Sequence, residues 1–223
     1  MTKDKYIKTK KGFDFLSPFY DFSVRLFFGN SLDKSQFFFL KELGPCKSIL
    51  VFGGGTGKIL PVLGDCQLPE KVCYVDLSEK MIAKAKKRPR VRSSNGFASV
   101  EFVCGSFADI PADSRFDLII TPYVLDCLVE PELFAGMQLL KEKLSTKGKW
   151  LFVDFNIPKK GPARYFSWIS IRMLYFFFNI VCGLGGRNLP DFSSNFEILR
   201  FKLDAEKYFC SGMLTAKVYS PSE

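Results

Sequence analysis

A glycine-rich loop stands between an apolar run and a helical pattern. The apolar run is Ile49–Phe52, and glycines then occupy alternate positions at Gly53, Gly55 and Gly57. A loop without Cβ atoms after a buried strand lets a ligand lie against bare backbone, at the positive end of the next helix. The sequence therefore predicts that this loop binds a nucleotide-like small molecule.

Strand-like and helix-like patterns alternate from the residues before this loop onward. We expect strands over 48–52, 71–77, 100–104, 116–121 and 149–155, with helices over 57–64, 78–88 and 131–144. This alternation is typical of a doubly wound parallel sheet. Two more strands, over 196–203 and 213–219, are expected as an antiparallel pair at one edge. The predicted fold class is α/β: a Rossmann-like seven-stranded sheet, mostly parallel, with an antiparallel edge strand.

The segment before the sheet is expected to form an N-terminal helical cap. Residues 1–11 are interpreted as a polar tail, and apolar residues recur at helical spacing over 13–43, beginning with Phe15, Phe19 and Phe22. A length of 223 residues fits one domain. We expect a single domain over 1–223, with the tail and cap in 1–43 and the α/β core in 44–223.

A long amphipathic helix is predicted over about 162–186. Its apolar residues, among them Phe166, Met173 and Phe176, recur every three to four positions. The uncharged part, 173–186, has 14 residues, short of the roughly 20 that span a bilayer, so no transmembrane segment is predicted. The helix either packs on the sheet or covers a substrate, and an apolar lid favours an apolar or aromatic substrate.

Histidine is absent, which excludes His metal ligands and His general bases, and no metal site is expected. The seven cysteines form no CxxC pair, and their odd number argues against a disulfide framework. A reducing, cytoplasmic location is therefore expected.

The net charge of +9 comes largely from two runs, Lys3–Lys11 and Lys80–Arg92. Such runs form solvated surfaces, or they attract nucleic acid, anionic membrane or acidic substrates. No RNA-binding signature accompanies them. A nucleic-acid partner is disfavoured but stays open, as does weak peripheral membrane contact, and the sequence leaves the oligomeric state undetermined.

The carboxyl ends of the strands are where an open parallel sheet binds its ligand. Asp76 ends the second predicted strand, 23 positions after Gly53, and a carboxylate there accepts both hydroxyls of an adenosine ribose. Leu77, Met81 and Phe107 offer apolar surface to an adenine ring. The dinucleotide fingerprint fails, because neither register of the loop has its third glycine, and no Walker G-K-[ST] sequence exists.

The G-x-G-x-G spacing resembles the S-adenosylmethionine (SAM) loop of the class I methyltransferases, and the resemblance extends over about 13–219. Its further motifs are Ser78–Met81, Gly105–Pro111, Phe116–Ile119 and Leu144–Trp150, and the opening Tyr20-Asp21 resembles the quinone-biosynthesis-like small-molecule subgroup. The resemblance implies SAM as cofactor and S-adenosylhomocysteine as product. The implied cofactor-binding residues are Gly53, Gly54, Gly55, Thr56, Gly57, Asp76, Leu77, Met81, Ser106, Phe107 and Thr121.

Three positions depart from the family pattern. Val51 replaces an acid that commonly helps to hold the amino-acid end of SAM. Ser106 replaces the Asp that usually contacts the adenine amino group, and its hydroxyl still accepts a hydrogen bond. The fourth strand ends Thr121-Pro122-Tyr123, which differs from the Asn-Pro-Pro-Tyr of many amine and nucleobase methylators and disfavours those substrates.

The catalytic candidates near the expected pocket are Asp126, Tyr123 and Tyr20. Asp126 in an apolar setting acts as a general base or caps the following turn; the two tyrosines assist the chemistry or cover the cofactor. The sequence predicts a SAM-dependent methyltransferase that acts on a small, apolar or aromatic molecule by in-line methyl transfer. The alternatives are a catalytically silent SAM- or adenosine-binding module, suggested by Val51, and an rRNA or protein methyltransferase, suggested by the positive charge.

Overall fold

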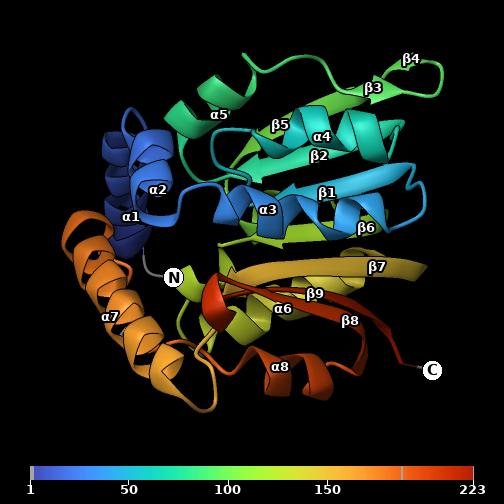
Figure 1. Ribbon diagram of the computed structural model, residues 1–223. Helices are drawn as coiled ribbons and strands as arrows, with labels where there is room; N and C mark the ends of the chain where they lie inside the picture. The colour runs from blue at the N-terminus through green and yellow to red at the C-terminus, as the bar shows by residue number, and fades with distance from the viewer. Residues whose placement is uncertain (1–2, 187, 223) are drawn as a thin grey trace.

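The computed structural model describes residues 3–186 and 188–222, so Met1 and Thr2 of the expected tail lie outside the described residues. Within them, the main sheet has the strand order β5-β2-β1-β6-β7-β9-β8 (Figure 1). Its strands are β1 (Ser48–Phe52), β2 (Lys71–Asp76), β5 (Ser99–Cys104), β6 (Phe116–Pro122), β7 (Leu144–Phe155), β8 (Phe201–Phe209) and β9 (Leu214–Pro221). The first five pair in parallel, whereas β9 pairs antiparallel with β7 and β8. The predicted seven-stranded α/β fold is confirmed.

Helices cover both faces of the sheet, because the inner strands β1, β2, β6 and β7 carry apolar side chains on both sides. On one face lie α3 (Ser31–Phe37), the 3-10 turn η1 (Phe39–Lys41), α4 (Ile59–Cys66) and α5 (Glu79–Ala85). On the other face lie α6 (Glu132–Lys143) and α8 (Phe192–Ile198). On α5 the residues Met81, Ile82 and Ala85 are all buried.

Residues 3–11 belong to a helix, so the prediction of a polar tail is wrong for the described part of 1–11. Helix α1 (Lys3–Leu16) packs against α7 (Pro162–Cys182), and α2 (Tyr20–Phe28) follows α1. All three lie at the end of the sheet where β1 and β2 finish (Figure 1). Thr9 is buried, and Gly12 lies so close to α7 that a Cβ there would be 2.5 Å from the Cα of Cys182. Tertiary contact therefore orders a segment whose many lysines made it look like a tail.

The start of the strand predicted over 196–203 is also a helix. Residues 196–198, expected as strand, belong to α8, and the Asp191 side chain caps this helix by accepting the backbone N–H of Ser194 at 3.2 Å. Phe192, Phe196 and Leu199 recur at helical spacing and pack beneath the sheet. A short hairpin, β3 (Arg92–Ser93) with β4 (Gly96–Phe97), was not foreseen.

Candidate cofactor and substrate site

A cavity of about 580 Å³ lies at the carboxyl ends of β1, β2, β5 and β6. The topology explains its place, since these strand ends meet where the strand order reverses between β1 and β6. Most of the predicted site residues line it, namely Tyr20, Gly53, Gly55, Asp76, Leu77, Met81, Ser106, Phe107 and Tyr123.

The glycine loop needs its glycines for both backbone conformation and close packing. Gly53, Gly55 and Gly57 all have positive φ, at 75°, 62° and 81°, in the region that favours glycine. A Cβ at Gly53 would lie 2.4 Å from the Val124 side chain, and one at Gly57 would lie 2.7 Å from the Cα of Ala85. At Gly55 the Cβ position is open, and this residue lines the cavity. The loop thus offers bare backbone to a ligand at Gly55.

Gly54 supports the loop from behind and does not line the cavity. A Cβ there would lie 2.3 Å from the ring of Tyr74, whose hydroxyl donates to the carbonyl of Gly55 at 3.1 Å. Val51, which stands where relatives carry an acid, is fully buried in β1, in the same core cluster as Tyr74.

Asp76 joins the loop to the next helix while it faces the cavity. Its Oδ2 accepts the backbone N–H of Gly55 at 2.8 Å, and its Oδ1 accepts that of Ser78 at 2.9 Å. Ser78 in turn caps α5 by accepting the N–H of Met81 at 3.1 Å. Burial raises the pKa of Asp76 to about 6, and the two N–H bonds oppose that rise. A ribose is bound best when this carboxyl is ionised, because the carboxylate is then an acceptor only.

Aromatic and aliphatic side chains form the apolar part of the cavity beside Asp76. Phe52 and Phe107 stack with ring centroids 4.1 Å apart and an interplanar angle of 15°. Phe107 also fills the space above Gly136, where a Cβ would lie 2.5 Å from the ring.

Ser106 donates its backbone N–H and its hydroxyl to the Asp109 carboxylate at 2.7 and 3.1 Å. The Ser106 oxygen therefore keeps a lone pair for an adenine amino group.

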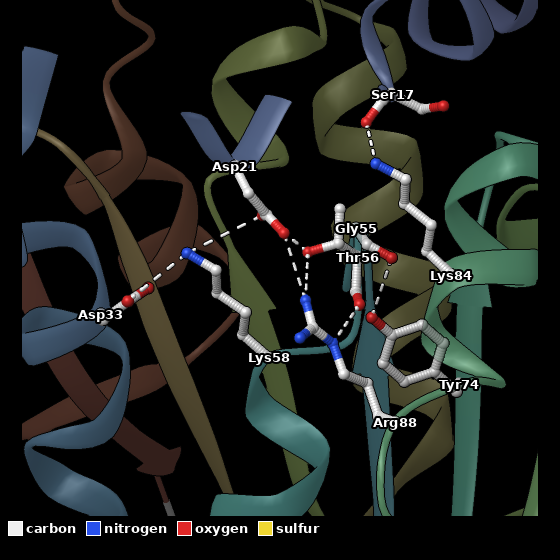
Figure 2. A network of polar contacts seen from close by, with 9 residues as sticks. All are labelled: Ser17, Asp21, Asp33, Gly55, Thr56, Lys58, Tyr74, Lys84 and Arg88. Atoms are coloured by element: carbon white, nitrogen blue, oxygen red, sulfur yellow. Dashed lines mark hydrogen bonds and ion pairs between the residues drawn. The ribbon is translucent and has the colours of Figure 1, made fainter. Parts of the chain in front are cut away.

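Thr56 points away from the cavity, into a polar network that ties the cap to the loop (Figure 2). Its hydroxyl donates to Asp21 of α2 at 2.8 Å. Arg88 donates to the other oxygen of Asp21 at 3.2 Å and to the carbonyl of Thr56 at 2.9 Å. Lys58 lies 3.8 Å from Asp21 and 3.5 Å from Asp33 of α3. This link between cap and loop was missed in the sequence, because it joins residues distant along the chain.

Helix α1 forms the wall of the cavity opposite the sheet. Tyr6, Thr9 and Phe13 line it, together with Lys5, whose ammonium lies 2.8 Å from the Glu132 carboxylate of α6. The sequence does carry a signal for this helix, since Tyr6, Thr9 and Phe13 stand at i, i+3 and i+7, which is one face of a helix. The predicted lid α7 does not line the cavity itself; only Leu184, just beyond it, does.

Asp126 is buried and does not line the cavity. Its backbone N–H donates to Oδ2 of Asp154 at 3.2 Å, and Cys127 donates its thiol to the Asp126 carboxylate at 3.6 Å. Burial raises the pKa of both carboxyl groups. The Asp126 charge raises the pKa of Asp154 further, whereas a hydrogen bond with Asp154 opposes the rise at Asp126. The pair therefore shares a proton more readily than it holds two charges.

The two candidate tyrosines line the cavity, whereas Thr121 does not. Burial raises the pKa of Tyr20 and of Tyr123, which keeps both phenols neutral. The Tyr123 hydroxyl lies 2.5 Å from the Ser35 hydroxyl, and Tyr123 has a positive φ of 52°. Thr121 is fully buried and accepts a hydrogen bond from the Trp150 indole at 3.0 Å. Among the described residues, no group of three metal-ligating side chains occurs.

Comparison with known proteins identifies related sequences. A family profile described as a methyltransferase domain matches residues 49–148. The malonyl-[acyl-carrier protein] O-methyltransferase of Anoxybacillus flavithermus is 28% identical over 112 residues. The aligned part covers 50% of this chain and only 40% of that relative.

Solved structures share the whole fold. The N-methyltransferase NodS from Bradyrhizobium japonicum, bound to S-adenosyl-L-homocysteine, has a TM-score of 0.67 at 12% identity, covering 99% of this chain and 100% of that one. A 1,6-didemethyltoxoflavin-N1-methyltransferase from Burkholderia thailandensis has a TM-score of 0.66 at 14% identity, covering 100% and 92%. At such identities the likeness shows the fold alone.

The fold, and the site in which Asp76 adjoins the glycine loop, are those of a class I methyltransferase. The methyltransferase-domain profile over residues 49–148 agrees with this class, while the quinone-biosynthesis subgroup stays a prediction. The cavity fits SAM, because Gly55 leaves an open backbone cradle and Asp76 keeps free lone pairs beside an apolar slot. When bound, SAM supplies an electrophilic methyl group on sulfur.

Proposed function

We propose that this protein transfers the SAM methyl group to a small, apolar or aromatic molecule. The observation that carries this proposal is the cavity itself, which α1 covers and which apolar side chains dominate beyond the cofactor-binding residues. These side chains include Phe13, Leu128, Leu139 and Leu184. A polynucleotide or a folded protein would have to displace α1 before its acceptor atom reached the loop.

The residues of the cavity act by binding, orienting and excluding water. In-line displacement at a methyl carbon requires an acceptor held about 3 Å away and protected from solvent. The neutral hydroxyl of Tyr20 can donate a hydrogen bond that orients an acceptor. The Tyr123 hydroxyl donates to Ser35, whose own proton goes to the Leu32 carbonyl, so Tyr123 offers an acceptor a lone pair and ring surface. We retain Asp126 as a candidate base only through a relay, since Cys127, its neighbour, is the residue that lines the cavity.

Isothermal calorimetry with SAM, S-adenosylhomocysteine and NADH tests the cofactor assignment. We expect binding of both adenosyl compounds and none of NADH. A chain that binds neither adenosyl compound would remove the basis of the proposal.

Transfer of labelled methyl groups into fractionated cell extract tests the acceptor class. We expect label in the small-molecule fraction. Label in RNA or protein alone would establish the alternative acceptor classes, and SAM binding without any labelled fraction would favour the silent module.

The organisation and compartment of the protein are also part of the proposal. We propose that 1–223 forms one domain, because α1 of the cap and α5 and α6 of the core line one cavity. All seven cysteines are free thiols, which supports a reducing, cytoplasmic compartment. Limited proteolysis that released a stable fragment from 1–43 or 44–223 would contradict the single domain.

A further inference from the structure

Helix α7 turns an apolar row outward, contrary to the packing expected of such a row. Phe166, Ile169, Met173, Phe176 and Ile180 stand three to four positions apart, and each is exposed, with Phe176 at 70%. The opposite side of the helix packs inward through residues such as Ile171 and Tyr175. Contiguous exposed apolar surface of this kind marks an interaction site in a soluble fold.

The preceding cap adds a second apolar row on the same side of the molecule. Phe19, Phe22 and Leu26 are each at least 65% exposed. The inner residues of α2, Val24 and Phe28, pack in the same cluster as the inner residues of α7. Both rows therefore point away from one shared core, and Figure 1 shows α1, α2 and α7 together on the left of the view, with α1 packed against α7. We call these two rows the outer face.

Positive charge surrounds the outer face. Arg164 and Arg172 are exposed on α7, Arg25 on α2, and Lys8 and Lys11 on α1. The chain contains no Asp or Glu between residues 156 and 190. The guanidinium of Arg172 lies 4.9 Å from the ring of Trp168, an arrangement suited to the boundary between apolar and aqueous phases.

A groove of about 430 Å³ between α1 and α7 combines the two properties. Lys8 and Lys11 lie along it beside Ile7 and Phe15, with Asp4 as its one acidic residue. Ammonium groups next to apolar side chains match a phospholipid, whose anionic headgroup adjoins its acyl chains.

From these observations we propose that the outer face lies in the plane of an anionic lipid membrane. Apolar residues insert among the acyl chains while the surrounding cations meet lipid phosphates. A second copy of the chain fits poorly, because pairing two outer faces would bring their positive borders together. This proposal is independent of the methyl acceptor.

An in-plane position fits α7 better than a transmembrane one. The helix Pro162–Cys182 is long and apolar enough to cross a membrane by length and composition. Crossing would place Arg172 at its centre and would break the contacts of Ile171 and Tyr175 with the core. A helix with one packed side and one apolar side bordered by cations is the interfacial kind.

Intrinsic tryptophan fluorescence tests the proposal. Trp168 is 46% exposed and Trp150 is fully buried, so a change of emission on membrane binding reports on Trp168. We expect blue-shifted emission with vesicles of phosphatidylcholine and phosphatidylglycerol, and little shift with phosphatidylcholine alone. Trp168→Phe should abolish the shift, and raised salt should weaken it. Unchanged emission with the anionic vesicles at low salt would overturn the proposal.

Vesicle flotation with matched variants tests the apolar contribution. The triple variant Phe22→Ser, Phe166→Ser and Phe176→Ser should lower apparent vesicle affinity by on the order of a hundredfold. The control, Phe97→Ser with Ile198→Ser, removes exposed apolar residues outside the outer face and should bind as the native chain does. Circular dichroism checks that the variants fold, and all five side chains are exposed.

A charge-reversed variant provides a second test in case the triple variant does not fold as the native chain does. Arg164→Glu with Arg172→Glu should reduce binding to anionic vesicles, whereas Lys202→Glu on β8 should not. Equal flotation of all variants, or resistance of bound protein to alkaline extraction, would overturn an in-plane electrostatic contact. A vesicle-free dimer that the triple Ser variant makes monomeric would assign the face to a second copy instead.

Discussion

At the scale of single residues, Asp76 both positions the glycine loop and faces the cofactor cavity. Asp76→Ala should weaken S-adenosylhomocysteine binding about tenfold to a hundredfold, the cost of leaving ribose hydroxyls unpaired. Calorimetry measures this loss. Glu70→Ala, which changes an exposed acid outside the cavity, should leave the affinity unchanged.

The raised pKa of Asp76 makes cofactor binding dependent on pH. The carboxylate accepts hydroxyl protons, so affinity should fall as the pH drops below about 6, where the group becomes protonated. Asp76→Asn should bind weakly at every pH and lose this dependence. A native affinity that is constant from pH 7 to pH 5 would contradict the role given to this carboxylate.

The buried Asp126–Asp154 pair should lower stability as the pH rises. Their folded-state pKa values are raised, so the folded state binds more protons than the unfolded state above the usual Asp value of about 4. The free energy of unfolding due to this pair should therefore fall as the pH rises above about 4. Asp126→Asn should reduce that slope in urea titrations, and an unaltered slope would show that the pair does not titrate as described.

Side-chain direction limited how much of the site the sequence could predict. Asp76, Leu77, Met81 and Phe107 were placed in the cavity by strand ends and helix spacing, and they line it. Thr121 lies on the expected strand, but its side chain turns to the opposite side and meets Trp150. The direction in which a strand-end side chain turns depends on residues distant in sequence. The same holds for Asp126, which contacts Asp154.

At the scale of elements, the contact between α1 and α7 depends on a missing side chain. Gly12→Ala would place a Cβ 2.5 Å from the Cα of Cys182, where backbone must move. Unfolding free energy should fall by about 1–3 kcal/mol. Gly44→Ala is the control, because nothing lies within 4 Å of its Cβ position, and thermal melting compares the two. Equal melting temperatures would show that the helices are not closely packed in solution.

Whether a segment forms a helix or a strand was predictable where one periodicity dominated. The prediction failed where two signals competed. The buried strands β1 and β6 are almost wholly apolar and were placed correctly. In α1 the lysines hide the short inward-facing row Tyr6, Thr9 and Phe13, and only contact with later helices orders it. At α8 a phenylalanine-rich run has strand propensity, but its spacing lets one helical side pack under the sheet.

At the scale of the whole molecule, cofactor binding should protect the cap. Since α1 forms a wall of the cavity and α2 is tied to the loop through Asp21 and Arg88, ligand contact opposes local opening of both helices. Amide hydrogen exchange within 3–28 should slow when S-adenosylhomocysteine is added, and exchange in β8, distant from the cavity, should not. Unchanged exchange in 3–28 would mean that the cap does not enclose the ligand.

The position of α1 also sets an order of events during synthesis. Some of its partners come late in the chain: Lys5 meets Glu132, and Gly12 meets Cys182. While the ribosome is still making α7, α1 can reach only earlier elements such as the start of α5, whereas β1 and β2 can already pair. Helix α1, one wall of the cavity, is thus translated early but completes its packing late. A nascent chain therefore has its glycine loop before it can enclose a ligand there.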